Sequence, residues 1–169
     1  MQLGPYPECI CHQGRMVNLL LPMQTQQLLT GPSITQEGAE LFTLKADQIG
    51  DYWPTIVSFL LMVHNRDWLL DQVLTALTEA KAQLWGIARN GIIKGVWITR
   101  IDETASARFG FVWIAAGEGL DAGVPLFLDC TEQWFREKEC EYIEIVGRRG
   151  WGRVLPGYHE RAVIFRKDL

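Results

Sequence analysis

Residues 109–125 read FGFVWIAAGEGLDAGVP, an apolar strand followed by a glycine-rich loop and the start of a helix. A strand that enters a helix through such a loop leaves the first backbone N–H groups of the helix unpaired at the end of a sheet. Together with the positive end of the helix dipole, these groups form a seat for an anion such as a pyrophosphate. The same glycines also suit a tight strand-to-helix turn in which glycine adopts positive φ. The sequence supports both interpretations of this loop.

Regular strand and helix patterns flank this stretch. Upstream, two apolar strands are separated by Asn90-Gly91, the strongest short-range signal for a hairpin. Alternation and helical spacing of apolar positions predict the other elements. We expect strands over 40–45, 82–89, 92–101, 107–116, 140–147 and 161–166, helices over 51–64, 67–81 and 124–138, and a short irregular or helical crossing over 148–160.

Residues 1–40 show no sustained strand or helix period. They contain several prolines and a glutamine-rich stretch over 23–29. A segment of this kind cannot bury a core alone, so an ordered one must lie against something else. We expect residues 1–40 to be an irregular arm that docks on a protein partner, on a second copy of the chain or on its own domain. Residues 41–169 are expected to form that domain.

The composition indicates a globular protein with one well-buried core, because 48% of its 169 residues are hydrophobic. The net charge of -4 argues against a broad nucleic-acid-binding face, which carries a basic excess. The longest apolar stretches, such as residues 56–63, are far shorter than the ~20 residues that a membrane span needs. No secretory signal is visible, so we expect a cytoplasmic protein without a membrane partner.

The four cysteines favour free thiols over a metal site. Cys9, Cys11 and His12 are spaced like the start of a zinc site, but no second closely spaced pair follows. Cys130 and Cys140 fall in an expected helix and strand, where cysteine acts as a small hydrophobic residue. We therefore expect no bound metal.

Three tryptophans fall on consecutive expected strands. They are Trp85, Trp97 and Trp113. Aromatic side chains on neighbouring strands pack across the sheet, so we expect one cluster. That cluster lies either in the core or along the wall of a ligand cleft.

The expected order is a strand, two helices, three strands, a helix, a strand, a short helix and a strand. Accompanying features are the hairpin WGIARNGIIKGVW over 85–97, the strand 109–116 with its glycine-bearing loop, and the motifs GRRGW at 147–151 and LPGY at 155–158. In these features residues 41–169 resemble the GNAT superfamily of acyl-CoA-dependent N-acyltransferases. The resemblance implies an α/β (α+β) fold, with a mixed, mostly antiparallel central sheet flanked by helices.

The resemblance also implies acetyl-CoA or a related acyl-CoA as cofactor, with its pyrophosphate at the loop after residue 116. The family loop usually begins with Gln or Arg, whereas here Glu118 and Asp121 stand in the loop. Each carboxylate repels a phosphate by about 1 kcal/mol at contact range, even in water. The residues that the resemblance places at the cofactor are Ile114, Ala115, Ala116, Gly117, Gly119, Ala122 and Gly123.

Catalysis in the family needs a base that takes a proton from an amine, and often a tyrosine that protonates the leaving thiolate. Glu118 and Asp121 are the base candidates by position, although acids there equally complement a helix dipole. Tyr158 is the acid candidate, and core packing is its alternative role. Glu141 and Glu144 point to opposite faces of a strand, so only one of them can reach the cleft.

Two functions from different classes fit this sequence. The first is an N-acyltransferase that acylates a small amine, a protein N-terminus or a lysine. The second is a catalytically silent protein that keeps the fold and docks into an assembly through residues 1–40. The loop and the GRRGW motif are similar to small GNAT-like proteins of tailed bacteriophages, so a virion component is one form of this second function.

Overall fold

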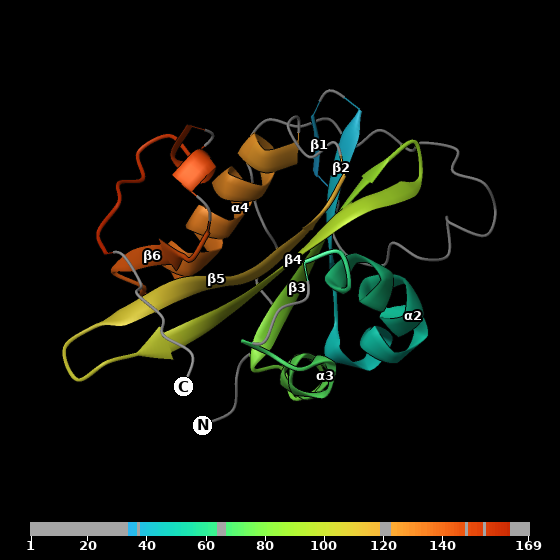
Figure 1. Cartoon of the computed structure of the whole chain (residues 1–169), viewed down its shortest axis with the longest axis horizontal. Helices are drawn as coiled ribbons and strands as arrows, with labels where there is room; N and C mark the ends of the chain where they lie inside the picture. The colour runs from blue at the N-terminus through green and yellow to red at the C-terminus, as the bar shows by residue number, and fades with distance from the viewer. Residues whose placement is uncertain are drawn as a thin grey trace, which may run out of the picture.

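A computed structural model of the chain describes residues 34–36, 38–63, 67–118, 123–147, 149–153 and 155–162. In these residues six strands form one sheet, with α2 and α3 on one face and α4 on the other (Figure 1). The strands are β1 (Ile34–Gln36), β2 (Ala39–Leu44), β3 (Ala82–Arg89), β4 (Ile92–Glu103), β5 (Arg108–Gly117) and β6 (Tyr142–Ile145). The helices are α2 (Ile49–Leu60), α3 (Leu70–Thr78) and α4 (Gly123–Glu137), with short 3-10 turns η1 (Ala46–Gln48) and η2 (Arg149–Arg153).

The strands lie across the sheet in chain order, from β1 to β6. Each pair from β1 to β5 is antiparallel, whereas β5 and β6 are parallel. A parallel pair needs a long crossover connection, and α4 provides it. The sequence predicts a mixed, mostly antiparallel sheet flanked by helices, and this prediction is confirmed.

Each face of the sheet has its own core. The core beneath α2 and α3 contains Leu60 and Val73, both fully buried. The core beneath α4 contains Trp97, which is also fully buried and whose ring stacks on Phe127 at a centroid distance of 4.7 Å. A slip of one residue would turn the apolar side chains of a strand out of their core, so burial on both faces specifies the register.

The sheet begins earlier than the sequence patterns predict. Residues 34–36 form the edge strand β1, paired with β2, inside the range 1–40 that is expected to be an irregular arm. Three residues are too few to display a strand period, which is why the pattern does not reveal them. Residues 1–33 lie outside the part of the chain that the structure describes, and an arm there stays a prediction.

The other element boundaries agree with expectation to within a few residues. β3 has the predicted bounds, while α2 begins at Ile49 and not at residue 51, and α3 begins at Leu70 and not at residue 67. The expected closing strand over 161–166 lies mostly outside the described residues. Arg161 and Ala162, which are described, have no regular structure.

The expected tryptophan cluster is divided between the two faces, so that expectation is wrong. Trp85 and Trp97 stand opposite each other on β3 and β4, in the α4 core. Trp113 packs against the other core. The register between β4 and β5 shifts between Ile98 and Thr99, which leaves Trp113 as an extra residue on β5. A bulge of this kind re-aims the side chains that follow it.

Candidate functional site

The most unusual backbone feature of the described sheet is the edge of β5 that faces β6. β5 pairs with β6 only from Phe109 to Val112, because β6 ends at Ile145 while β5 continues to Gly117. The bulge at Trp113 comes directly after the last pair. Bulges are common beside active sites, where they end a pairing or re-aim a side chain. Among the described residues, the last five of β5 therefore have a sheet partner on the β4 side only.

Hydrogen bonding to β4 shows which backbone groups of β5 face this open edge. The Glu118 N–H donates to the Lys94 carbonyl at 2.9 Å, so this pair is a hydrogen-bonded one. Hydrogen-bonded and non-hydrogen-bonded pairs alternate along an antiparallel ladder. Ala116 and Ile114 therefore also direct their N–H and C=O groups toward β4. It follows that Ala115 and Gly117, the residues between them, direct theirs toward the open edge.

The N-terminal end of α4 is the second part of the site. A Cβ at Gly123 would collide with Cδ1 of Ile87 on β3, so glycine lets the helix begin close against the sheet. The first turn of α4 carries no acidic side chain. The positive end of the helix dipole is therefore not neutralised within that turn. The open edge at the end of β5 and the N-terminal end of α4, which begins over Ile87 of β3, are the two parts of the candidate site.

The structure places the predicted cofactor residues in two groups. Ile114, Ala115, Ala116 and Gly117 form the end of β5, and Gly123 begins α4. Within the first group, Ile114 and Ala116 are buried, whereas Ala115 and Gly117 are partly accessible. Gly119, Ala122 and the predicted base Asp121 lie outside the described residues.

Glu118, the other predicted base, follows β5 directly. Its side chain is exposed, and its backbone N–H is occupied by the Lys94 carbonyl. That N–H is thus not offered to a phosphate, and the carboxylate adds negative charge at the mouth of the open edge. The structure brings Glu118 to the end of β5, as the sequence predicts, without a cation paired to it among the described residues.

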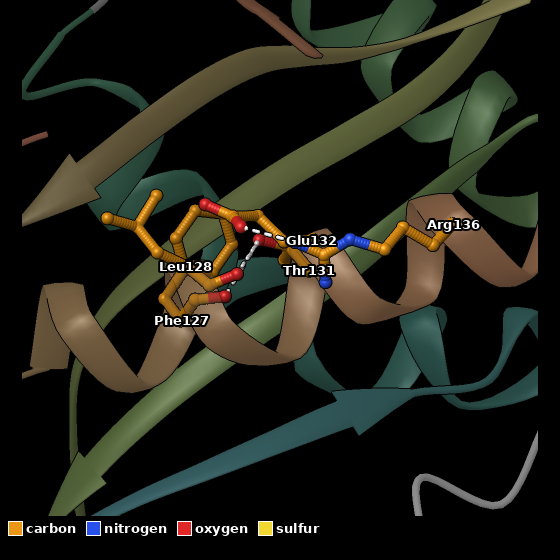
Figure 2. Close-up of polar contacts among 5 residues, drawn as sticks. All are labelled: Phe127, Leu128, Thr131, Glu132 and Arg136. Carbon is orange, nitrogen blue, oxygen red and sulfur yellow. Dashed lines mark hydrogen bonds and ion pairs between the residues drawn. The ribbon is translucent and has the colours of Figure 1, made fainter. Parts of the chain in front are cut away.

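Tyr158, the predicted acid, is held against the middle of α4. Its hydroxyl donates to the carboxylate of Glu132. Arg136 also binds this carboxylate, at 2.9 Å, and Figure 2 shows this ion pair on α4. Burial, and then the charge of Glu132, raise the pKa of Tyr158 to about 12. Glu132 is nine residues after Gly123, which is about 13 Å along a helix axis. The contact between Tyr158 and Glu132 therefore holds the segment around Tyr158 against α4, away from the N-terminal end of that helix.

The sequence patterns did not reveal an aromatic strip on the face opposite α4. We use this name for Phe109, Phe111, Trp113 and Tyr142, which lie on β5 and β6. The Phe109 and Tyr142 rings stack at 5.1 Å. The Arg100 guanidinium lies 4.9 Å from the ring centres of both Phe111 and Trp113. The sequence signal for this strip was the aromatic residue at every second position of 109–113. That spacing puts the aromatic side chains on one face of the strand, but it does not show which face the helices leave uncovered.

Glu144 lies on the same face of β6, where β5 and β6 begin to diverge. It pairs in register with Phe111 and its carboxylate lies 3.5 Å from Arg161. Of the two glutamates weighed for this strand, Glu144 is therefore the one beside the aromatic strip. Its neighbours Ile143 and Ile145 pack in the α4 core. Glu141 precedes the strand and is exposed.

Neither a metal-binding group nor a membrane-spanning helix is found among the described residues. No group of three His, Cys, Asp or Glu side chains among the described residues is close enough to hold a metal ion. Cys9, Cys11 and His12 lie outside this part. None of the described helices is long and apolar enough to cross a membrane.

Several solved acetyltransferases are similar in structure to this chain. An aminoglycoside acetyltransferase from an uncultured soil metagenomic sample matches with a TM-score of 0.60 and 12% identity, over 79% of this chain and 98% of that one. A predicted acetyltransferase from Clostridium acetobutylicum, solved with acetyl-CoA, has a TM-score of 0.57 and 14% identity, over 77% and 96%. A GCN5-related N-acetyltransferase from Ralstonia eutropha JMP134 has a TM-score of 0.57 and 13% identity, over 78% and 99%.

The sequence itself matches no protein-family model and no curated protein. At 12–14% identity the likeness lies in the arrangement of the elements, so it shows the fold. The chain has the GNAT fold, that of the GCN5-related N-acetyltransferases, as the order of its elements predicts.

The raised pKa of Tyr158 gives a test of its structural contact. A tyrosine whose pKa is about 12 in the folded protein and 10.0 when unfolded stays protonated longer in the folded state. Its contribution to stability is complete below pH 10 and is lost as the pH rises toward 12. We expect Tyr158→Phe to make stability, measured by urea unfolding, fall less steeply between pH 10 and 12. Equal slopes for the two proteins would contradict the contact with Glu132.

Proposed function

We propose that this protein binds acetyl-CoA, or a related acyl-CoA, along the open edge of β5 and transfers the acyl group to a primary amine. The observation that carries this proposal is the unpaired half of β5. Ala115 and Gly117 direct hydrogen-bonding groups toward that open edge, and the chain runs on from the end of β5 to the N-terminal end of α4. The structural likeness to acetyltransferases, one of them solved with acetyl-CoA, supports the same function.

The chemistry of coenzyme A fits these groups. Its thiol-bearing arm is extended and contains two amide groups, which can pair with an open strand edge as an added strand does. Ala115 and Gly117 have minimal side chains and leave space for such an arm. The first N–H groups of a helix have no acceptor within the helix, and the first turn of α4 carries no acidic side chain, which favours a pyrophosphate. Glu118 opposes that binding, because its charge has the sign of the phosphates.

When bound, the cofactor would supply an acyl group activated as a thioester. Transfer forms an amide bond and breaks the thioester bond, while one proton leaves the amine and one reaches the thiolate. Glu118 is placed to accept a proton at the end of β5. A role for Tyr158 as the acid would require its hydroxyl to leave Glu132, and its raised pKa makes it a poor proton donor at neutral pH.

The second candidate function is a protein that retains the GNAT fold without acyl transfer. The exposed Glu118 carboxylate favours it, because it stands where an anionic cofactor would approach. Under this alternative the assembly role of residues 1–40 replaces catalysis. Binding of acetyl-CoA to the whole chain separates the two functions.

Calorimetric titration of acetyl-CoA into two proline variants tests the open edge directly. Ala115→Pro removes an N–H that faces the open edge, and proline is tolerated in strands where the N–H is not needed for the ladder. We expect this variant to fold and to bind acetyl-CoA about five- to tenfold more weakly, because one hydrogen bond contributes about 1 kcal/mol.

Ala116→Pro is the matched control, because its N–H faces β4. We expect this variant to lose about 1–3 kcal/mol of stability, since it removes a ladder hydrogen bond and leaves a carbonyl of β4 unpaired. No detectable heat with the unmodified protein would refute acyl-CoA binding. Equal affinity of the unmodified protein and the Ala115→Pro variant would place the ligand elsewhere.

The substitution Glu118→Gln tests whether the Glu118 carboxylate faces the bound cofactor. Removing a charge that repels a phosphate by about 1 kcal/mol is expected to tighten acetyl-CoA binding about fivefold, and less at 0.5 M salt. Glu79→Gln, at the end of α3, removes an exposed charge far from the loop and serves as control. An unchanged affinity in Glu118→Gln would show that Glu118 does not face the cofactor.

A further inference from the structure

The face of β5 and β6 opposite α4 carries aromatic side chains that belong to no core. Phe109, Phe111 and Tyr142 are partly exposed, and none of them packs into either of the two cores of the described residues. The residues of β5 that lie between these aromatic positions face α4. At Gly110, for example, a Cβ would meet the ring of Phe135 on α4. The strip runs from the base of β5 to Trp113, where β5 and β6 diverge. It therefore leads to the open edge from the side that α4 leaves free.

Exposed apolar side chains also gather at the C-terminal end of α2 and just before α3. Leu61, Met62, Val63 and Leu69 are 58%, 51%, 39% and 59% exposed. The end of α2 lies over β4 and β5 (Figure 1), and Leu60 shares a core with Ile114 of β5. A contiguous group of exposed apolar side chains marks an interaction site.

The composition of this surface is that of a protein interface. Aromatic residues, Met and Arg are enriched at the centres of such interfaces, whereas Lys and Glu are depleted. The aromatic strip, Met62 and Arg100 provide these residue types. The exposed side chains at the end of α2 project outward, so they suit insertion into another polypeptide better than enclosure of a small molecule.

The charges on this face are paired with one another. Arg100 binds Asp102 at 2.9 Å, and Arg161 lies 3.5 Å from Glu144 and over the ring of Tyr142. A site for a polycationic amine needs carboxylates in excess, since each cation must be matched on binding. Among the residues that the structure describes, these two ion pairs leave no excess of carboxylates on this face. An acceptor with a single positive charge beside apolar groups is the better match.

We propose that the aromatic strip and the end of α2 bind the N-terminal segment of a polypeptide whose first residues are apolar, and that its α-amine is the acceptor. This inference rests on the proposed acyl transfer. An α-amine has an ordinary pKa of about 7.7–8.0, against about 10.4 for a lysine, so a larger fraction is unprotonated at neutral pH. The apolar side chains of the acceptor would contact the strip while the amine reaches the divergence point at Trp113.

The experiment measures acetylation of synthetic peptides by the whole chain with acetyl-CoA, followed by thiol release and product mass. The probes are a lysine-free decapeptide beginning Ala-Phe-Leu, the same peptide beginning Ala-Asp-Glu, and the polycationic amine kanamycin. We expect the apolar peptide to have the highest kcat/KM, by about tenfold or more. Higher kcat/KM for the acidic peptide or for kanamycin would overturn the inference.

A double variant, Leu61→Ser with Met62→Ser, tests the surface itself. Both side chains are exposed, so we expect normal folding, a KM for the apolar peptide raised about tenfold, and unchanged kcat and acetyl-CoA affinity. Ile92→Ser is the matched control, because Ile92 is 59% exposed and stands at the β3–β4 hairpin. An unchanged KM in the double variant, or an equal rise in Ile92→Ser, would overturn the inference.

Calorimetry separates a failure of this inference from a failure of the proposed function. If the unmodified protein binds acetyl-CoA but acetylates neither peptide, the polypeptide acceptor is wrong and the cofactor site stands. If acetyl-CoA does not bind, both proposals fail together.

Discussion

The parallel pairing of β5 with β6 is the constraint on which the rest of the structure depends. Two parallel strands need a crossover, so α4 must leave the end of β5, cross one face of the sheet and return. This route connects the end of β5 to the N-terminal end of α4, which begins over Ile87 of β3. The pair covers only residues 109–112 of β5, so the same route leaves the second half of that strand open. The candidate site is a consequence of this connection.

The packing of the two faces keeps that edge in place. Gly123 allows α4 to begin close to Ile87, and Trp97 stacks on Phe127 beneath the same helix. On the other face, α2 lies over β4 and β5 and leaves the aromatic strip uncovered among the described residues. The sheet therefore presents an anion-favouring helix end on one side and an apolar surface on the other. These two surfaces suit the two proposed reactants. The helix end suits an anionic thioester, and the apolar surface suits an apolar segment that carries the amine.

Much of the fold was predictable because its signals are local. Asn90-Gly91 specifies a tight hairpin, and the apolar positions of α4 recur at helical spacing. The two hairpin strands were therefore expected to within two residues of their bounds, and α4 to within one. β1 was missed because three residues show no period. The bulge at Trp113 was missed because it exists only in the register between β4 and β5. The sequence predicted the positions of Gly117 and Glu118 because both lie where an expected strand ends. It did not predict the aromatic strip, because that surface depends on which face of the sheet the helices leave uncovered.

The central claim is that Ala115 and Gly117 offer their backbone N–H groups to a ligand, while Ile114 and Ala116 give theirs to β4. Residue-resolved amide hydrogen exchange, with and without acetyl-CoA, measures this alternation directly. In the free protein we expect fast exchange at Ala115 and Gly117 and slow exchange at Ile114 and Ala116. Acetyl-CoA is expected to slow only the first pair. Equal protection of all four amides in the free protein, or no change on adding acetyl-CoA, would contradict the claim.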